Sequence, residues 1–285
     1  MQELKGMPVV KSLTEGFLTE TETLLKSNVI PKLSVIRIGE RDDDLAYERG
    51  IIKRFQAANA YVDVIALPIN VTQENLEKTI IHLNNDKSVH GILIFRPLPK
   101  SLSEDRIKNI IAPEKDMDCM SMKNIAQVFA GDSGAYPPCT PQAVIELLDY
   151  YNIDLTGKKV TVVGRSLVVG KPLSMLLLTR NATVTICHTK TVNLAEECKK
   201  ADILIACAGA AKMIKNNYVH SDQIVIDVGI NMDGDKLCGD VDYEDTADIV
   251  KAITPVPGGV GTVTTSVLLK HTIQSAKRAI KFESK

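Results

Sequence analysis

The chain has almost no net charge, because 34 lysines and arginines balance 35 aspartates and glutamates over 285 residues. The basic side chains are interspersed with acidic ones, which excludes the electrostatic footprint of a nucleic-acid or anionic-membrane binder. No apolar run approaches the roughly 20 residues of a membrane span, and the N-terminus lacks the basic-then-apolar pattern of a signal peptide. We therefore expect a cytoplasmic protein whose partners are small molecules.

The sequence also lacks any Cys-x-x-Cys pair, and no metal site is predicted. Several of its six cysteines lie inside apolar runs, which is typical of buried thiols in a reducing compartment. The composition, 45% hydrophobic and 24% charged, is that of an ordinary globular chain, and its length is sufficient for two lobes with separate cores.

Strand and helix patterns alternate in the first part of the chain. Strands are predicted at 32–39, 61–68 and 90–97, and helices at 46–58, 73–85 and 102–111. Such repeated β-α units favour a parallel sheet. Between Pro113 and Pro141 the pattern gives way to Pro, Asp, Gly and Met, which indicates a domain boundary. The first domain is therefore predicted over residues 1–140.

A second α/β lobe is predicted over residues 141–263. Its strands are expected at 159–163, 183–187, 202–208 and 223–228, with helices after the first two. This pattern favours a doubly wound, Rossmann-type sheet, whose ligands lie outside the carboxyl ends of the strands. An amphipathic helix at 264–285 is expected to cross back and pack on the first lobe.

The turn after the strand at 159–163 has the form of a phosphate-binding site, since a glycine ends the strand and a helix follows. It reads Gly164-Arg-Ser-Leu-Val-Val-Gly170-Lys-Pro172. A Walker A loop needs four residues between its glycines and a Ser or Thr after the lysine. Here there are five residues, and Pro172 follows the lysine. A dinucleotide turn, with Ser166 where the second glycine usually stands, is favoured over a mononucleotide phosphotransferase.

The end of the second strand favours NADP over NAD. NAD-binding turns usually place an Asp or Glu there for the ribose 2′-hydroxyl, but this chain has His188-Thr189-Lys190. Together with Arg165, these residues could meet a 2′-phosphate. The alternative interpretation is that they are solvated loop residues, which leaves NAD possible.

The segment Ile253–Thr262 combines two prolines with three glycines in ten residues. Proline fixes φ and glycine permits positive φ, a combination that lets the main chain approach a flat ligand closely. A structural loop between domains is the alternative interpretation.

Five sets of residues together resemble the methylenetetrahydrofolate dehydrogenase/cyclohydrolase family. They occur in the family's order, and the resemblance runs from about residue 30 to the C-terminus. The motifs are Lys115-Asp-Met-Asp118, Pro138-Cys-Thr-Pro141, Gly164-Arg-Ser166 with Val169-Gly-Lys-Pro172, Asp227-Val-Gly-Ile-Asn231 and Pro255-Val-Pro-Gly-Gly-Val-Gly261.

The resemblance implies a folate-binding first lobe, an NADP-binding second lobe and a homodimer. Tyr47 would orient the folate and Asp118 would hydrogen-bond its pterin ring, although a core aromatic and a turn-forming carboxylate are the alternatives. The remaining implied residues belong to the second lobe: Gly164, Arg165, Ser166, Thr189 and Ile230 would line the cofactor, and Pro257, Gly258 and Gly259 would close beside the folate.

Two departures from the family pattern bear on its second activity. Family members that also hydrolyse the methenyl group carry a lysine four residues after the tyrosine, where this chain has Ile51. Four residues advance a helix by about 400°, so position 51 shares the face of Tyr47. The glutamine that supports that lysine is replaced by Phe95. Lys53 is expected to face solvent, and Arg96 to point to the opposite face from Phe95.

We therefore expect an NADP-dependent methylenetetrahydrofolate dehydrogenase that has lost the cyclohydrolase, since hydrolysis needs a positioned polar group whereas hydride removal needs chiefly aligned rings. One alternative is a bifunctional enzyme with weak hydrolase activity through Lys53 or Arg96. Another is a catalytically silent subunit that binds folate or dinucleotide. Smaller departures at Cys119, Ala126 and Thr262-Val263 put the geometry of the substrate loop in question, not the fold.

Overall fold

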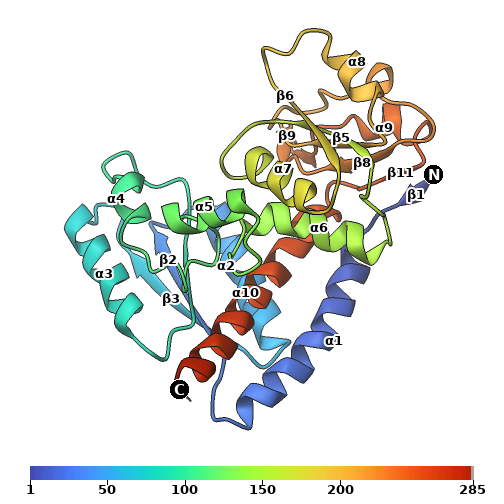
Figure 1. Ribbon diagram of the computed structural model, residues 1–285. Coiled ribbons are helices and arrows are strands. Elements are labelled where there is room, and N and C mark those ends of the chain that lie inside the picture. The colour runs from blue at the N-terminus through green and yellow to red at the C-terminus, as the bar shows by residue number, and fades with distance from the viewer. Residues whose placement is uncertain (284–285) are drawn as a thin grey trace. The chain divides into compact units, whose positions relative to one another are not determined.

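The computed structural model describes the backbone of residues 1–283 and the side chains of residues 1–280. The chain divides into two compact α/β units (Figure 1). Unit 1 comprises residues 1–11, 128–133 and 140–264, and unit 2 the remainder. Residues 1–11 belong to unit 1, because the first strand joins its sheet.

Unit 1 is built on a six-stranded sheet in which every pair is parallel. In spatial order its strands are β1 (Gln2–Glu3), β11 (Ala252–Ile253), β8 (Ile224–Asp227), β7 (Ile203–Ala206), β5 (Lys159–Val163) and β6 (Thr183–Cys187). From β5 the chain goes to β6 on one side, and from β7 to β8 on the other. The strand order therefore reverses between β5 and β7, where doubly wound sheets bind their ligands. The predicted doubly wound α/β class is confirmed.

Short helices and a hairpin complete unit 1. They are α6 (Cys139–Tyr150), α7 (Gly170–Thr179), α8 (Leu194–Lys199), the 3₁₀ turn η1 (Asn216–Tyr218), the β9–β10 hairpin (Asn231–Asp233 and Lys236–Cys238) and α9 (Tyr243–Thr246). Val163, Leu204, Val225 and Ile253 come from four neighbouring strands and are almost fully buried in one cluster. Apolar runs of this kind are what a parallel sheet covered on both faces requires.

Unit 2 holds a three-stranded parallel sheet of order β3 (Tyr61–Leu67), β2 (Lys32–Ile38) and β4 (Gly91–Ile94). Its helices are α2 (Asp42–Gln56), α3 (Gln73–Asn85), α4 (Glu104–Lys108) and parts of α1 (Gly6–Leu25), α5 (Met122–Ala130) and α10 (Val260–Glu283). The predicted helix at 73–85 has the predicted bounds, because Thr72 caps it by accepting the Asn75 N–H.

Both faces of the unit 2 sheet are covered. Ile36 and Ile92 face α3, whose Leu76 and Ile80 are fully buried in the same cluster. Leu33 and Val35 alternate with Ile36 along β2, so they point to the other face, where they are fully buried. Figure 1 shows α2 and α10 on the side of this sheet away from α3.

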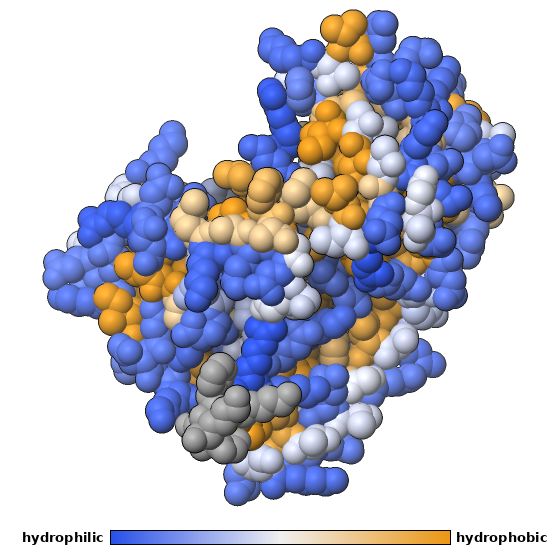
Figure 2. Space-filling view, viewed as in Figure 1, coloured by the Kyte–Doolittle hydropathy of each residue, from blue (hydrophilic) through white to orange (hydrophobic). Residues whose placement is uncertain are grey.

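The sequence patterns missed the helices α1 and α5 and the four-residue α9. Helix α1 contains Gly16 and several threonines, two of which, Thr21 and Thr23, donate their hydroxyls to carbonyls one turn back, and such residues are poor helix formers. Helix α5 lies in the Pro- and Gly-rich stretch that was interpreted as irregular. It presents Met122 and Phe129 to solvent, 55% and 75% exposed, and Figure 2 shows hydrophobic surface over it.

The C-terminal helix α10 starts at Val260, earlier than the predicted 264, and residues 284–285 of that prediction lie outside the described residues. From residue 265 on it belongs to unit 2, as the prediction required. Its Lys277 forms an ion pair with Glu20 of α1, 2.9 Å between Nζ and Oε2. None of the helices described is long and apolar enough to cross a membrane.

His90 makes the stability of unit 2 depend on pH. It is buried before β4, and its Nδ1 accepts the backbone N–H of Lys32 at 3.1 Å, which requires a neutral ring. Burial lowers the pKa of His90, and Lys115 and Lys32 lower it further. A lowered histidine pKa stabilises the fold above its unfolded pKa, and that stability is lost as pH falls. We expect the free energy of unfolding to fall as the pH drops below about 6.5, with a slope of up to about 1.4 kcal/mol per pH unit from this group.

Urea unfolding of the parent and of His90→Asn over this pH range measures the effect, because the asparagine accepts the same N–H and does not titrate. The variant should have the smaller slope. His82→Gln, which changes an exposed histidine on α3, serves as the control. If the free energy of unfolding had the same slope against pH in the parent and in His90→Asn, His90 would not be the cause of the pH dependence.

Candidate active site

The turn after β5 is packed so tightly that its two glycines leave no room for a side chain. The strand ladder continues to Gly164, whose N–H donates to the Cys187 carbonyl at 2.9 Å. Gly164 has φ +140°, and a Cβ there would overlap the Cys207 carbonyl oxygen and lie 2.7 Å from its Sγ. Gly170 in turn lies against the Gly164 carbonyl. A side chain at either glycine would therefore not fit where β5 and β7 diverge, the place at which doubly wound sheets bind their ligands.

The polar side chains around this turn are available to a ligand. Ser166 Oγ accepts the Val169 N–H at 3.0 Å, which orders the turn, and the side chain remains exposed. Arg165 is exposed and has no carboxylate partner within residues 1–280. The loop after β6 is closed by the His188 N–H, which donates to Thr191 Oγ1 at 2.9 Å, and leaves Thr189 exposed. A guanidinium without a partner at this edge fits a 2′-phosphate.

A cavity of about 220 Å³ brings two predicted sets of residues together in unit 1. Ile230, predicted to line the cofactor, shares its wall with Pro257, Gly258 and Gly259, predicted to close beside the folate. Ile230 is 65% exposed, an unusual position for an isoleucine that serves only packing. The loop at Pro257–Gly259 is held in place by the N-terminal segment, since the Gly6 N–H donates to the Gly258 carbonyl at 2.8 Å.

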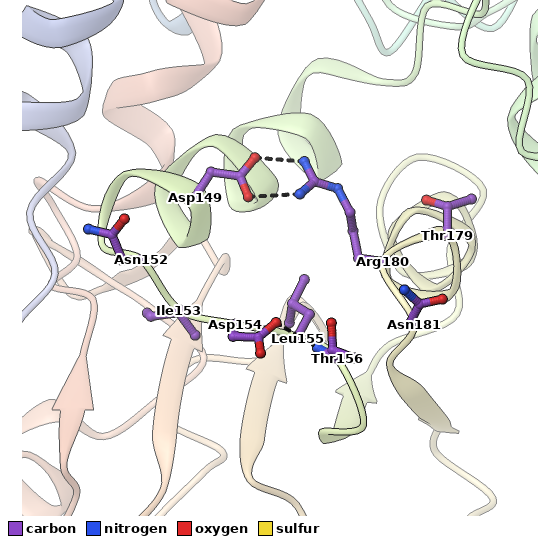
Figure 3. A pocket seen from close by; sticks show the side chains of 9 residues that line it. All are labelled: Asp149, Asn152, Ile153, Asp154, Leu155, Thr156, Thr179, Arg180 and Asn181. Atoms are coloured by element: carbon purple, nitrogen blue, oxygen red, sulfur yellow. Dashed lines mark hydrogen bonds and ion pairs between the residues drawn. The ribbon is translucent and has the colours of Figure 1, made fainter.

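A second cavity in unit 1, of about 430 Å³, lies at the wrong edge of the sheet for a dinucleotide (Figure 3). Leu155 and Thr156 precede β5 and Asn181 precedes β6, so its lining marks the amino ends of these strands. Arg180 spans its rim with a bidentate ion pair to Asp149, at 3.0 and 2.6 Å. The carboxyl-end cavity beside Ile230 is therefore the better candidate.

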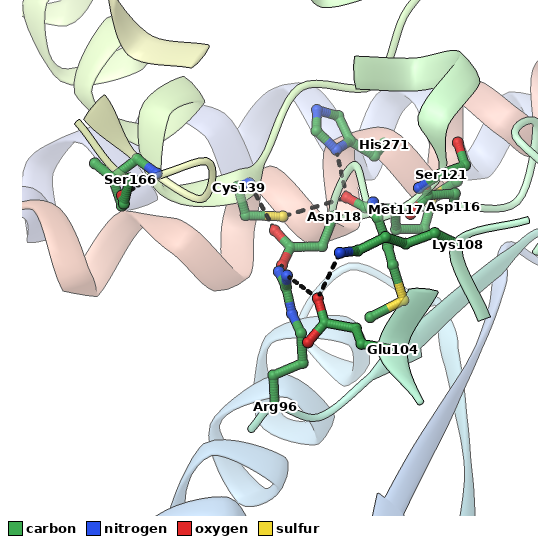
Figure 4. Close-up of polar contacts among 12 residues, drawn as sticks. Arg96, Glu104, Lys108, Asp116, Met117, Asp118, Ser121, Cys139, Ser166 and His271 are labelled. Carbon is green, nitrogen blue, oxygen red and sulfur yellow. Dashed lines mark hydrogen bonds and ion pairs between the residues drawn. The ribbon is translucent and has the colours of Figure 1, made fainter. Parts of the chain in front are cut away.

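In unit 2, Asp118 is held in a fixed orientation (Figure 4). Its Oδ1 accepts the Cys139 N–H at 2.8 Å and its Oδ2 accepts Arg96 Nη2 at 2.9 Å. Arg96 also approaches Glu104, which lies 3.5 Å from Lys108 Nζ. The Asp118 side chain remains 26% exposed, so lone pairs are left for a ligand.

The other residues of the Lys115–Asp118 motif shape the loop that carries Asp118. The Asp116 carboxylate is buried, and burial raises its pKa although it accepts the N–H groups of Met120 and Ser121 at 2.8 and 2.7 Å. His271 Nδ1 lies 2.9 Å from the Met117 carbonyl oxygen. Helix α10 therefore contacts the motif directly.

Lys115 closes the C-terminal end of α3. Its Nζ donates to the carbonyls of Leu83, Asn84 and Asp86 at 2.9, 2.8 and 2.7 Å, and a cation at this end also meets the helix dipole favourably. We expect Lys115→Met to lower the free energy of unfolding by about 3 kcal/mol, because three part-buried carbonyls lose a charged donor. Urea unfolding at neutral pH measures the loss.

Lys78→Met is the matched control, because Lys78 forms only an exposed ion pair with Glu74 on the same helix. Lys78→Met should lower the free energy of unfolding by less than about 1 kcal/mol. A loss at Lys115 no larger than the loss at Lys78 would show that the carbonyl contacts contribute nothing.

Tyr47 lies beside apolar residues at the two positions where the family resemblance expects a polar pair. Tyr47 is 36% exposed on α2, and its ring centroid lies 5.5 Å from that of Phe95. Ile51 is fully buried on the same helix. Lys53 is exposed, as its place on the helix predicts.

Sequence reasoning missed the role of Arg96. Its strand position alone predicted only that it points away from Phe95, whereas its contact with Asp118 joins positions that are distant in the chain. The sequence did offer one signal for this role, because Arg96 is a cation at the end of an apolar strand. Among the smaller departures from the family pattern, Cys119 has φ +57°, a conformation that glycine adopts more readily than cysteine. No group of three or more potential metal ligands occurs in the described part of the chain.

The unit 1 sheet, with its reversal beside Gly164, defines a dinucleotide-binding protein. The family models for tetrahydrofolate dehydrogenase/cyclohydrolase match both parts of the chain, the catalytic domain at residues 4–118 and the NAD(P)-binding domain at residues 138–280. The chain belongs to this family. The resemblance inferred from the motifs is therefore confirmed, as is the dinucleotide cofactor.

Relatives and solved structures agree over nearly the full length. The chain is 52% identical over 277 residues to the bifunctional protein FolD of Clostridioides difficile, covering 97% of this chain and 96% of the relative. It is 36% identical to the FolD methylenetetrahydrofolate dehydrogenase/cyclohydrolase structure from Campylobacter jejuni, with TM-score 0.95 and coverage of 98% and 99%. A Trypanosoma brucei FolD structure complexed with NADP and an inhibitor gives 35% identity, TM-score 0.91 and coverage of 97% of each chain.

Proposed function

We propose that the protein is an NADP-dependent dehydrogenase that oxidises 5,10-methylenetetrahydrofolate to 5,10-methenyltetrahydrofolate in one-carbon metabolism, without the cyclohydrolase step. Its family and the names of its relatives support the folate substrate and the dehydrogenase. The observation that carries the proposed loss is the apolar contact of Tyr47 with Phe95, together with the complete burial of Ile51.

The residues around Gly164 fit NADP, which supplies the nicotinamide that accepts the hydride when it is bound. The main chain at Gly164, which carries no side chain, would lie against the pyrophosphate, and Arg165, with Thr189, would meet the 2′-phosphate. Ile230 would pack against the cofactor from its exposed position beside the cavity. The cofactor could come close to the main chain at this edge of the sheet, because Gly164 carries no side chain.

Folate would be oriented by residues that the structure fixes in place. Asp118, held by Arg96 and the Cys139 N–H, would accept hydrogen bonds from the pterin, whose ring carries N–H donors. Tyr47 would align the reacting carbon by stacking, and the loop at Pro257–Gly259 would exclude water beside it. Alignment of this kind is sufficient for hydride removal.

Hydrolysis of the methenyl product needs more than alignment. Water must be activated and a proton moved by a polar group at the reacting carbon. Neither Ile51 nor Phe95 can do this, and Lys53 is exposed to solvent on another side of α2. The relatives named bifunctional give the opposite expectation for the chain as a whole, so direct assays must decide.

Two assays on the purified chain test the proposal. We expect reduction of NADP with methylenetetrahydrofolate, and no acceleration of methenyltetrahydrofolate hydrolysis over the uncatalysed rate. Hydrolase turnover would overturn the proposed loss, and Lys53→Met and Arg96→Leu would then show which cation supports it. Binding of both ligands without NADP reduction would indicate a silent binding subunit instead. A strong preference for NAD would contradict the role given to Arg165.

We also propose a cytoplasmic homodimer. All six cysteines are free thiols, as expected in a reducing compartment. The unit 1 sheet ends at β6, whose outer edge is unpaired among the described strands and carries the 38% exposed Ile186, a surface that a second copy could cover. Sedimentation velocity measures the mass in solution, and a monomer at micromolar concentration would contradict the dimer.

A further inference from the structure

Two buried carboxylates lie below the carboxyl edge of the unit 1 sheet. Asp227 ends β8 and Asp240 follows β10, and they are 3% and 0% exposed. Neither has a cationic partner in the described part of the chain. Buried charges without a counter-ion must be satisfied by hydrogen bonds, so the donors that surround them define what they do.

The donors to Asp240 come from loops that are distant in sequence. Its Oδ2 accepts the N–H groups of Ala208 and Gly209 at 2.5 and 3.0 Å. Its Oδ1 accepts the Ala210 N–H at 2.8 Å and Asn231 Nδ2 at 2.9 Å. Three successive amides that converge on one anion form a nest. Here the anion belongs to the protein itself, and it fixes the loop that follows β7.

Asp227 fixes Asp240 in turn. Its Oδ1 accepts the N–H groups of Asp240 and Gly229, both at 3.0 Å, and its Oδ2 accepts the Val241 N–H at 2.9 Å. The packing leaves no free space, since a Cβ on Gly229 would overlap the Asp240 carboxyl group and one on Gly239 would overlap that of Asp227. Burial raises the pKa of Asp227 to about 6 despite its three donors.

The loop that Asp240 holds follows β7 and lies beside the Gly164 turn that follows β5. Cys207 lies between the end of β7 and Ala208, and its carbonyl and Sγ pack directly against Gly164. A shift of the loop would therefore move the surface on which the Gly164 turn rests. The same carboxylate holds Asn231, the neighbour of Ile230, so both walls of the proposed cofactor site depend on it.

We propose that Asp240 is a positioning residue for the dinucleotide: its carboxylate holds the Ala208–Ala210 amides and Asn231 so that the Gly164 turn and Ile230 are pre-organised to bind NADP. This inference rests on the proposed use of the β5–β7 edge as the cofactor site. Asp240 itself is buried and does not need to touch the cofactor. Its loss should weaken cofactor binding while leaving folate binding in unit 2 unchanged.

Asp240→Asn in the full-length protein tests the proposal. An amide presents an N–H₂ group to amides that need an acceptor, so at least one charge-assisted hydrogen bond is lost. Such a loss corresponds to roughly a 10- to 100-fold change in an equilibrium constant. We expect the Kd for NADP, measured by calorimetry, and the KM for NADP to rise about 30-fold, with kcat at saturating NADP and the KM for folate changed less than about threefold.

Asn231→Ala and Asp245→Asn complete the experiment. Asn231→Ala removes a single donor to Asp240 and should raise the Kd for NADP about fivefold, so it decides the question if Asp240→Asn fails to fold. Asp245 is the matched control, because it accepts the Asn216 N–H at 2.9 Å in the same unit and lines neither cavity described above. Its variant should keep the parent Kd within about twofold.

The outcomes separate this inference from the proposed activity. An unchanged Kd for NADP in folded Asp240→Asn, or in Asn231→Ala if the former does not fold, would overturn it. Equal weakening of NADP and folate binding would also overturn it, since that result indicates a general structural role. If the parent binds NADP but does not reduce it, the proposed dehydrogenase fails, and the calorimetric comparison still decides the role of Asp240. A parent that does not bind NADP would refute both.

Discussion

Gly164→Ala is expected to lower kcat/KM for NADP by about 100-fold or more. The added methyl group would overlap the Cys207 carbonyl oxygen, and alanine would have to adopt a φ of +140° that L-residues rarely populate. The overlap can be relieved only if the turn moves away from β7, which displaces the main chain proposed to lie against the pyrophosphate. Backbone strain of this kind costs about 1–3 kcal/mol before any steric overlap is counted.

Steady-state kinetics with NADP varied, together with thermal unfolding, measures the effect. Gly16→Ala in α1 is the control, since a Cβ there meets nothing within 4 Å, and alanine in a helix should preserve activity and stability. A Gly164→Ala variant that is folded and as active as the parent would show that the turn does not bind the cofactor.

Restoring both polar residues, as Ile51→Lys with Phe95→Gln, is expected to create cyclohydrolase activity about 100-fold above the parent background, the low end of the contribution of a positioned acid or base. Position 51 is fully buried and lies on the face of α2 that carries Tyr47. A lysine there alone would be a buried charge without a partner, so Ile51→Lys by itself should destabilise the fold by several kcal/mol. The glutamine should recover part of that loss by accepting an N–H from the lysine.

The absorbance change during hydrolysis of methenyltetrahydrofolate measures the activity, and urea unfolding of the double variant and of Ile51→Lys alone measures the change in stability. Arg49→Lys is a suitable control, because it places a lysine at an exposed position of the same helix. The idea fails if the folded double variant hydrolyses no faster than the parent. It also fails if the parent already hydrolyses at a comparable rate.

Local patterns predicted most of the fold. Strands β5 and β6 begin and end where the β-branched runs do, and α3 was placed correctly because a capping threonine and a helical period coincide. Strand β1 and the β9–β10 hairpin were missed, since a segment of two or three residues carries no period. Helices α1 and α5 were missed because their sequences are poor in the usual signals, and packing determines their conformation.

Part of the candidate site could likewise be predicted from local sequence patterns, and part could not. The Gly164 turn and the loop at Pro257–Gly259 could be found because glycine and proline at fixed offsets have a local meaning. Arg96 on Asp118, and Asp240 on the loop after β7, could not, because each contact joins residues separated by twenty or more positions in the chain. The spacing of residues in the sequence does not predict contacts that form only when the chain has folded.

The outermost strand of the unit 1 sheet is made from the first residues of the chain, since Gln2 pairs with Ala252. Contacts so distant in sequence form late, because the entropy of closing the intervening loop must first be overcome. On the ribosome β1 therefore has no partner until residue 252 has been synthesised. The two strands of this pair are made about 250 residues apart in time, so this edge of the sheet closes only after β11 has left the ribosome.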